Sequence, residues 1–287
     1  APAEVKLAKN DKRPVHVVTT AKEFAKALGN DRIIHIKAKT LDLCNTGIPE
    51  TPHFSNHPSL KDLKNTRIEC LGETPVDIPV ADIARSLDLS NCNNVQLINM
   101  RIVRKIPVGV GMPSQAGAIY LSGCEGVTLD RCTFRDSWAG FHMTDCKAIL
   151  VSRCRIENNL YQLGHLEECT DIRFFATSIT NNGMNNPYTN YCGIRIRTVK
   201  ELSIDRCLIS GNNMRTVLYF QDSASRAAVR NSLIAQQMLS NRSGNVKVTN
   251  SRMIPVKAKS SPNSSFLRSP QVIRNGAVIQ LQGGIRR

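Results

Sequence analysis

Apolar residues in the central part of the chain come in pairs two positions apart, and the pairs are separated by steps of three. One such set is Ile119, Leu121, Cys124, Val127, Leu129, Cys132 and Phe134. Alternation with a period of two is typical of a β-strand, and a step of three indicates a bend that inserts one residue. Each set therefore predicts three short strands that turn one face inward.

The same set recurs with a period of about 22 residues. Adding 22 to each number gives a set that starts at Phe141; a further 23 leads to Gly164, and a step of 30 leads to Ile194. An upstream set starts at Leu87, a looser one runs from about Tyr219 to Ile234, and Val246 to Met253 keeps half of the pattern. Units of this size bury their interior by stacking on their neighbours, which predicts an all-β solenoid, a parallel β-helix.

Two residue types repeat at fixed places in these coils. Asn159, Asn182 and Asn212 share a position after the third strand, where we expect a left-handed corner and hydrogen bonds along the stack. Two inward positions are rich in cysteine: Cys92, Cys124, Cys146 and Cys169 at one, Cys132, Cys154 and Cys207 at the other. Buried cysteine behaves as a small hydrophobic residue, although stacked neighbours are close enough for a disulfide. The spacings typical of a zinc site are absent.

The ends of the chain differ from the coils. Val15 and Val17 start a strand, Thr20 to Glu23 forms a capping box that opens a short helix stopped by Gly29, and Ile33 to Ile36 is a second strand. We predict one domain over 1–287: an N-terminal cap with a short helix over 1–40, coils over 41–255, and a basic C-terminal tail or cap over 256–287. Within the last segment, Gln271 to Ile285 is expected to add a strand or a cap.

These features resemble the right-handed parallel β-helix proteins of the pectate-lyase-like superfamily. The resemblance covers roughly residues 15–255: the helix-then-strand start, followed by coils of the form I-x-L-x-x-C-x-x-V-x-L-x-x-C-x-I-x-x-N. It is closest to secreted bacterial β-helix repeat proteins and implies a polysaccharide lyase or epimerase. In this superfamily the substrate cleft usually follows the first parallel sheet. Such motifs specify architecture and leave the chemistry open.

Positive charge is concentrated at the C-terminal end. The net charge is +15, and no Asp or Glu follows Asp222, whereas eleven Lys and Arg do. A segment of one sign indicates a polyanionic partner, with a solubilising surface as the alternative. An acidic polysaccharide is favoured over nucleic acid, because no nucleic-acid motif is present and aromatic residues do not alternate with the basic ones.

The composition and the N-terminus bear on location. No apolar run is long enough for a transmembrane segment. The chain opens Ala1-Pro2-Ala3-Glu4, as a chain cleaved after a signal peptide would, so we expect a secreted or periplasmic protein. The sequence does not fix the oligomeric state.

One outward row on the first strand of each coil carries reactive side chains. From coil to coil it contains Asp88, Tyr120, His142, His165, Arg195, and then Tyr219 or Phe220. The row two residues further on contains Ser90, Ser122, Thr144, Glu167, Arg197 and Asp222. Stacked strands lie about 4.8 Å apart, so Tyr120, His142 and His165 are expected to reach one sugar ring.

Long insertions precede this row. They span Val103–Gly117 and Gly183–Cys192, and we expect them to form walls that bring further side chains to the substrate. The predicted substrate-binding residues are Arg195, Arg197, Glu167, Tyr219, Asp222, Arg104, Lys105, Tyr188 and Tyr191.

This row suits proton abstraction at C5 of a uronic acid. His142 or His165 is the expected base and Tyr120 the acid. Arg195 and Arg197 would hold the carboxylate and stabilise the enolate-like intermediate, and Glu167 would orient a histidine. The hypothesis is therefore a polysaccharide lyase or a uronate C5-epimerase.

Two alternatives stay open. The first is a non-catalytic scaffold that binds an anionic polymer through Arg230, Lys247 and Arg252. The second is a glycoside hydrolase that uses paired carboxylates, Glu167 with Asp222 or Asp145 with Glu168. No acidic cluster resembles the calcium site of pectate lyases, so no cofactor is predicted, and calcium stays open as an alternative.

Overall fold

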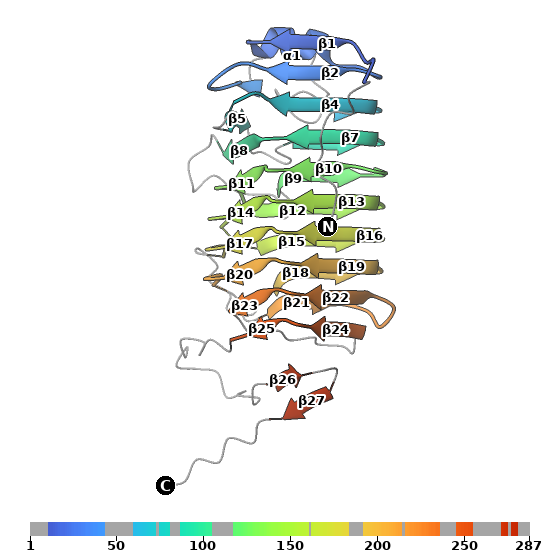
Figure 1. Cartoon of the computed structure of the whole chain (residues 1–287), viewed down its shortest axis with the longest axis vertical. Coiled ribbons are helices and arrows are strands. Elements are labelled where there is room, and N and C mark those ends of the chain that lie inside the picture. Colours follow the sequence, from blue (N-terminus) through green and yellow to red (C-terminus); the bar gives the residue numbers. More distant parts are fainter. Residues whose placement is uncertain are drawn as a thin grey trace.

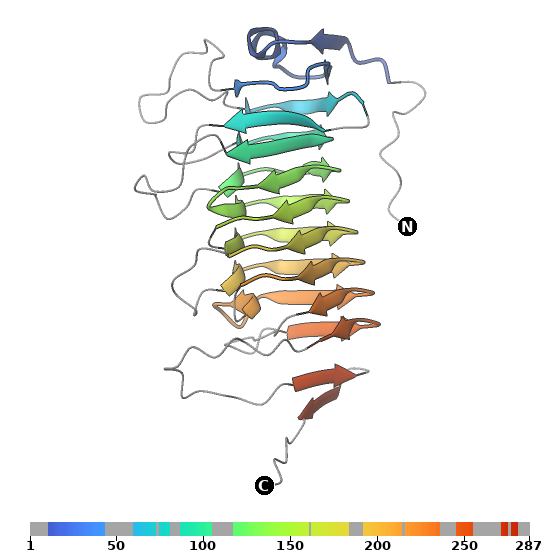
Figure 2. The ribbon, with the colours of Figure 1, turned by 90° about the vertical axis from the view of Figure 1, so that its left-hand side faces the viewer.

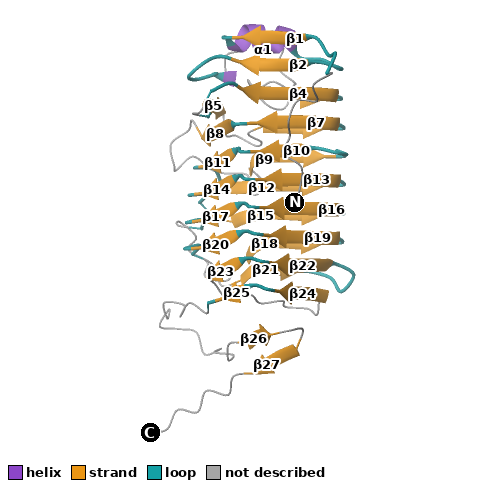
Figure 3. Cartoon of the chain, in the orientation of Figure 1, coloured by secondary structure: helices purple, strands orange, loops and turns teal. Residues whose placement is uncertain are grey.

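The computed structural model describes residues 11–43, 60–72, 75–80, 87–104, 117–160, 162–183, 192–213, 216–235, 245–254, 271–274 and 277–280. Within these residues the chain winds into stacked coils whose strands form three parallel sheets, the right-handed parallel β-helix that the sequence predicts (Figure 1). The coils follow one another along the long axis of the molecule, and the short helix lies at the N-terminal end (Figure 3). No helix in the described ranges is long and apolar enough to cross a membrane.

From β3 to β23 each coil contributes one strand to each sheet, in the order seven-stranded, ten-stranded, eight-stranded sheet. The seven-stranded sheet contains β21 (Thr216–Phe220), β18 (Cys192–Arg197), β15 (Gln162–Glu167), β12 (Ala139–Thr144), β9 (Gly117–Ser122), β6 (Leu87–Ser90) and β3 (Leu60–Lys61). The ten-stranded sheet contains β1 (Val15–Val18), β2 (Ile33–Ile36), β4 (Lys64–Cys70), β7 (Asn93–Ile98), β10 (Thr128–Asp130), β13 (Lys147–Ser152), β16 (Thr170–Phe175), β19 (Lys200–Asp205), β22 (Arg226–Arg230) and β24 (Asn245–Thr249). The eight-stranded sheet contains β25 (Arg252–Met253), β23 (Leu233–Ala235), β20 (Leu208–Ser210), β17 (Ser178–Thr180), β14 (Arg155–Glu157), β11 (Thr133–Arg135), β8 (Met100–Arg104) and β5 (Val76–Val80).

The bends between strands depend on residues in the left-handed conformation. Asp145 (φ 50°) precedes the buried Cys146 at the first corner, and Arg153 (φ 54°) precedes the buried Cys154 at the second. At the third corner the sequence prediction is wrong by one residue. The left-handed residues there are Asn158 (φ 57°) and Asn181 (φ 56°), each one position before the asparagine that we expected.

The expected asparagine stack itself is confirmed. The side-chain Oδ1 of Asn182 accepts hydrogen bonds from the backbone N and Nδ2 of Asn159, at 3.0 and 2.9 Å. Asn212 Oδ1 accepts the same pair from Asn182, at 2.9 and 2.8 Å. All three side chains point inward and are buried, because a tight corner leaves backbone donors that only the next coil can satisfy.

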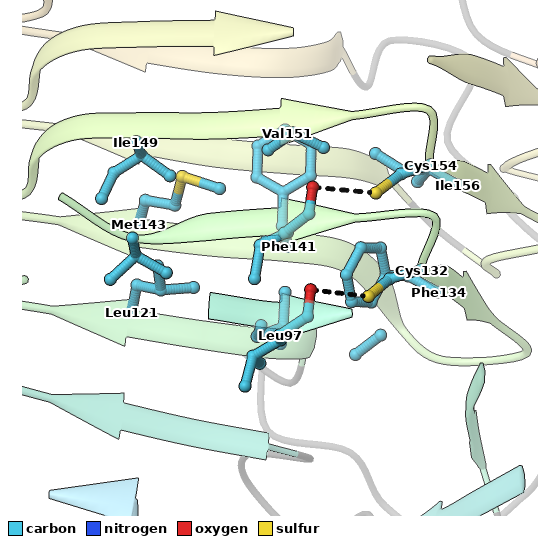
Figure 4. Close-up of a cluster of buried hydrophobic side chains, with 14 of the residues drawn as sticks. Leu97, Leu121, Cys132, Phe134, Phe141, Met143, Ile149, Val151, Cys154 and Ile156 are labelled. Atoms are coloured by element: carbon cyan, nitrogen blue, oxygen red, sulfur yellow. Dashed lines mark hydrogen bonds between the residues drawn. The ribbon is translucent and has the colours of Figure 1, made fainter. Parts of the chain in front are cut away.

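Aliphatic and sulfur side chains fill the interior of the coils (Figure 4). The eight described cysteines outside β18 are buried free thiols, as the interpretation of the two ladders as hydrophobic rows predicts. Their S–H groups bond to carbonyls of neighbouring strands, such as Cys132 to Leu97 at 3.4 Å. Burial raises the pKa of the Cys207 thiol to about 11. These cysteines are therefore packing residues.

One inward position holds a glycine where other coils carry large residues. A Cβ added to Gly164 would lie 2.3 Å from Cε2 of Phe141, because the phenyl ring occupies that space. The ring also contacts Phe174, with centroids 5.3 Å apart. A large side chain in one coil thus compensates for the missing side chain in the next.

The N-terminal elements cover one end of the stack. α1 (Ala21–Ala27) has the predicted capping box: Glu23 N donates to Thr20 Oγ1 at 3.2 Å, and Thr20 N donates to a Glu23 carboxylate oxygen at 3.1 Å. Phe24 points into the core and is fully buried. The helix therefore closes the apolar end of the solenoid.

At the other end, β26 (Gln271–Arg274) and β27 (Ala277–Gln280) pair in an antiparallel ribbon. In both views the ribbon lies beyond β24 and β25 (Figure 2). The sequence predicts an added strand or a cap here; the structure has two strands that pair antiparallel, whereas the strands of the coils pair in parallel.

Candidate functional site

The predicted row of reactive side chains lies on the seven-stranded sheet, on β9, β12, β15, β18 and β21 (Figure 1). The strand register aligns its members as expected: Tyr120 with His142, His142 with His165, His165 with Arg195, and Arg195 with Tyr219. Tyr219 takes the last place, because Phe220 points into the core and is 1% exposed. The catalytic and binding roles of these residues stay predictions.

Three aromatic rings stack along this row. The ring centroids of Tyr120 and His142 are 4.9 Å apart, and those of His142 and His165 are 4.7 Å apart with the planes at 62°. Tyr120 and His142 are only 8% and 7% exposed. The part of the row that reaches solvent most readily therefore starts at His165.

His165 has an unusual environment. Its Nε2 is buried and has no hydrogen-bond partner in the structure; the nearest carboxylate oxygen, Oε2 of Glu167, lies 3.8 Å away. Burial lowers the pKa of His165 to about 4, and the positive charges of Arg195 and Arg197 act in the same direction. The imidazole is therefore neutral at physiological pH and carries a nitrogen that can accept a proton.

Two guanidinium groups lie beside this imidazole. Arg195 and Arg197 occupy successive outward positions of β18, and both are exposed. Nη1 of Arg197 is 2.7 Å from Oε1 of Glu167 on the neighbouring strand. This pair fixes one arginine and leaves its other donors available, which suits the binding of a planar carboxylate.

Asp222 has a structural role in the chain. Its carboxylate accepts hydrogen bonds from the backbone N of Thr198, Ala224 and Ser225 and from the Ser225 hydroxyl. Burial raises the pKa of Asp222, but these bonds outweigh it, and the net pKa is lowered. These hydrogen bonds to the carboxylate hold the loop before β22 in place.

The second pair of carboxylates considered for hydrolysis is exposed at the first corner. Asp145 and Glu168 both have positive φ there, 50° and 53°. Among the described residues, no three His, Cys, Asp or Glu side chains form a group that could hold a metal ion.

The predicted walls fall largely outside the described residues. Lys105, Tyr188 and Tyr191 belong to these parts of the chain. Arg104 ends β8, where its backbone pairs with Val80 of β5.

Sequence reasoning missed a hollow on the ten-stranded sheet. A groove of about 890 Å³ lies on the outward side of β13, β16, β19, β22 and β24. The sequence does contain a sign of it. The outward residues of the second strand change from the large Leu150 and Arg173 to the small Ser203 and Ala228 in successive coils. Small side chains next to longer ones leave a depression in the surface.

Comparison with known proteins addresses the fold. Residues 86–253, more than half of the chain, match the protein family described as "Right handed beta helix region". No curated protein matches the chain in sequence.

Three solved structures are similar to the chain over most of its length. The thermostable pectate lyase PL 47 has a TM-score of 0.45 and 13% identity, over 91% of this chain and 85% of that chain. Pectate lyase Pel9A has a TM-score of 0.45 and 10% identity, over 89% and 83%. PfbA, a surface adhesin of Streptococcus pneumoniae, has a TM-score of 0.26 and 10% identity, over 93% and 90%.

Proposed function

Because the chain belongs to the family of right-handed β-helix regions, we propose that it uses one sheet of that helix to act on an acidic polysaccharide. The proposed reaction is abstraction of the C5 proton of a uronate unit, which leads to β-elimination or to epimerisation. The observation that carries the proposal is the neutral His165, whose buried Nε2 lacks a partner beside two exposed arginines.

In this proposal His165 is the base. The tautomer with its proton on Nδ1 presents a lone pair at Nε2. With a pKa of about 4 the imidazole is available but weakly basic in the free protein. Burial is the main cause of this low pKa, and Arg195 and Arg197 add to it. A bound carboxylate would offset the charge of the two arginines and so raise the pKa of His165 by their share. The substrate itself would thereby strengthen the base that attacks it.

The two arginines have a second part in the reaction. Loss of the C5 proton places negative charge on the carboxylate as an enolate-like intermediate. Guanidinium donors that already hold the carboxylate stabilise the enolate-like intermediate more than they stabilise the bound substrate, because the intermediate carries more negative charge. Glu167 holds Arg197 in place through the 2.7 Å contact.

The proton that completes the reaction would come from the rings stacked on His165. His142 is adjacent to it and Tyr120 follows, so the two offer a path for a proton along the row. Elimination needs that proton on the leaving oxygen, whereas epimerisation needs it on the opposite face of C5.

An acidic glycan as substrate would also place the protein outside the cytoplasm, secreted or periplasmic.

Incubation with alginate, polygalacturonate, hyaluronan and chondroitin tests this function. A lyase produces an unsaturated uronate that absorbs ultraviolet light, and an epimerase exchanges the C5 hydrogen with deuterium from heavy water. We expect one of these signals with the unmodified protein and its loss in His165→Ala.

His35→Ala is the matched control. His35 lies on β2 of the ten-stranded sheet, its Nε2 is likewise buried without a hydrogen-bond partner, and a Glu69 oxygen lies 4.0 Å away. This variant should keep the activity. Equal loss in both variants, or neither signal with any of the four polymers, would contradict the proposal.

A further inference from the structure

The groove on the ten-stranded sheet is formed by three parallel rows of side chains. Strand register places one residue of each row on β16, β19 and β22, and the rows cross the strands along the long axis of the solenoid. The middle row contains Arg173, Ser203, Ala228 and Lys247; one wall contains Asp171, Glu201 and Arg226; the other contains Phe175, Asp205 and Arg230.

The floor of the groove is low where the middle row has its two smallest members. Ser203 and Ala228 are neighbours on β19 and β22, and longer side chains stand on both sides of them. Since adjacent strands lie about 4.8 Å apart, the low section is open along the axis over more than one coil. This shape suits an extended chain that lies across the strands.

The charge of the walls changes along the groove. Toward the N-terminal end two carboxylates have partners: Asp171 Oδ1 accepts from Arg173 Nε at 2.6 Å, and Asp205 Oδ1 accepts from Asn231 Nδ2 at 2.9 Å. A third acidic residue, Glu201, is exposed on the wall beside Arg226. At the C-terminal end the charged groups are basic and exposed. They are Arg226, Arg230 and Lys247, and none of them forms an ion pair within the described part of the chain.

The spacing of these three cations excludes a compact anion as the best ligand. Arg226 and Arg230 are four residues apart on β22, or about 13 Å along an extended strand. Lys247 pairs with Ala228, midway between them on the next strand. Three charges around a low floor fit a polymer with several acidic groups better than one phosphate or sulfate ion.

We propose that this groove is a second binding site, for an acidic polysaccharide chain, separate from the row on the seven-stranded sheet. The site contains Arg226, Arg230 and Lys247 as anion contacts and Ala228 as its floor. Its ligand class is that of the proposed function, but none of its residues takes part in the proposed chemistry. It would hold the polymer while the other sheet acts on it.

The basic residues of the scaffold alternative lie on two different sheets. Arg230 and Lys247 line the groove, whereas Arg252 lies on β25 of the eight-stranded sheet. The three basic residues of the scaffold alternative thus lie on two sheets, and two of them line the groove.

A charge-matched comparison in the full-length protein tests the proposal. The groove variant is Arg226→Gln, Arg230→Gln, Lys247→Gln. The control is Lys22→Gln, Lys26→Gln, Arg155→Gln, which removes the same net charge from exposed residues of α1 and the eight-stranded sheet. The probe is polygalacturonate, and the measurement is the retardation of the protein in affinity gels that contain it.

Three exposed charge contacts predict about ten-fold weaker binding in the groove variant, and less than about two-fold in the control. Equal losses in the two variants would show attraction by net charge alone and would overturn the proposal. Circular dichroism establishes that each variant is folded.

A second variant tests the shape of the groove without a change of charge. Ala228→Trp fills the floor and keeps all three cations, and we expect it to weaken binding as much as their removal. Unchanged affinity in this variant would contradict a role for the hollow. If a short DNA duplex binds more tightly than polygalacturonate and only the groove variant loses it, nucleic acid replaces the glycan as ligand. The affinity measurement needs no turnover of the polymer, so failure of the proposed catalysis leaves this result separate.

Discussion

Replacement of Asn182 by Ala should destabilise the whole solenoid, because this buried side chain satisfies backbone groups of two coils. Its Oδ1 accepts from the backbone N of Asn159 at 3.0 Å, and its Nδ2 donates to the carbonyl of Ile156 at 2.9 Å. Alanine removes both bonds, and the 0% exposure of the side chain indicates that water does not replace them readily. A buried backbone group that loses its partner costs about 1–3 kcal/mol, so two such groups predict a loss of about 2–6 kcal/mol.

Urea unfolding at 25 °C measures this loss, and Trp138, the single tryptophan of the chain, reports on it by fluorescence. Trp138 follows Ser137, whose backbone N donates to Asn159 Oδ1 in the same stack. Asn213→Ala is the control, because this exposed asparagine makes one longer bond, 3.3 Å to the Gly183 carbonyl, and should cost less than about 0.5 kcal/mol. A loss below about 1 kcal/mol in Asn182→Ala would refute the argument that the stack satisfies otherwise unpaired backbone groups.

Four further predictions concern the row on the seven-stranded sheet and the core. The imidazole of His165 should titrate near pH 4 by NMR, and Arg195→Gln should raise that pKa; titration near the usual 6.5 would contradict the described environment. Since the folded-state pKa is lowered, only the unfolded chain binds this proton between pH 6.5 and about 4, so the free energy of unfolding should fall as the pH decreases through that range, and less steeply in His165→Gln. Gly164→Ala should cost about 1–3 kcal/mol in urea unfolding through contact with the Phe141 ring, and Phe141→Leu in the same chain should recover part of it; additive losses would show that the two do not interact. The Cys207 thiol, whose pKa burial raises to about 11, should react with Ellman's reagent far more slowly in native protein than in urea, as peptide mapping by mass spectrometry can verify; equal rates would contradict its burial.

The fold and the strand register follow from the sequence because both depend on local alternation. An apolar residue every second position defines which side of each strand faces the core, and stacking then aligns equivalent residues of successive coils. The alignment of Tyr120, His142, His165 and Arg195 was therefore predictable without a structure.

The environment of these aligned residues was not predictable. Periodicity shows that His142 points outward, but an outward residue on a sheet is buried when other parts of the protein cover it, as its 7% exposure shows. The lowered pKa of His165 likewise depends on burial first, which the sequence pattern does not contain. The predicted place of Asp222 opposite Arg197 is wrong by one residue, because the register pairs Arg195 with Tyr219 and Ile196 with Phe220. Its acceptor capacity is used by backbone donors of the adjacent loop.

The corner asparagines show a limit of another kind. Asparagine suits both a left-handed turn and a hydrogen-bonded stack, and Asn158 and Asn159 are consecutive. The sequence pattern does not say which of the two turns the chain, since either choice keeps the repeat length. Only the direction of the side chains, out for Asn158 and into the core for Asn159, separates the two functions.

The three corners of a coil differ in how much length they accept. At the first corner two residues join β12 to β13, β15 to β16 and β18 to β19, and five join β9 to β10 and β21 to β22. At the second corner two residues join β13 to β14 and β16 to β17. The third corner varies from the short link between β11 and β12 to the long one between β17 and β18. Insertions at the third corner therefore leave the stacking of the coils unchanged, so this corner is where selection or a protein engineer can exchange whole loops beside the histidine row while the scaffold keeps its geometry.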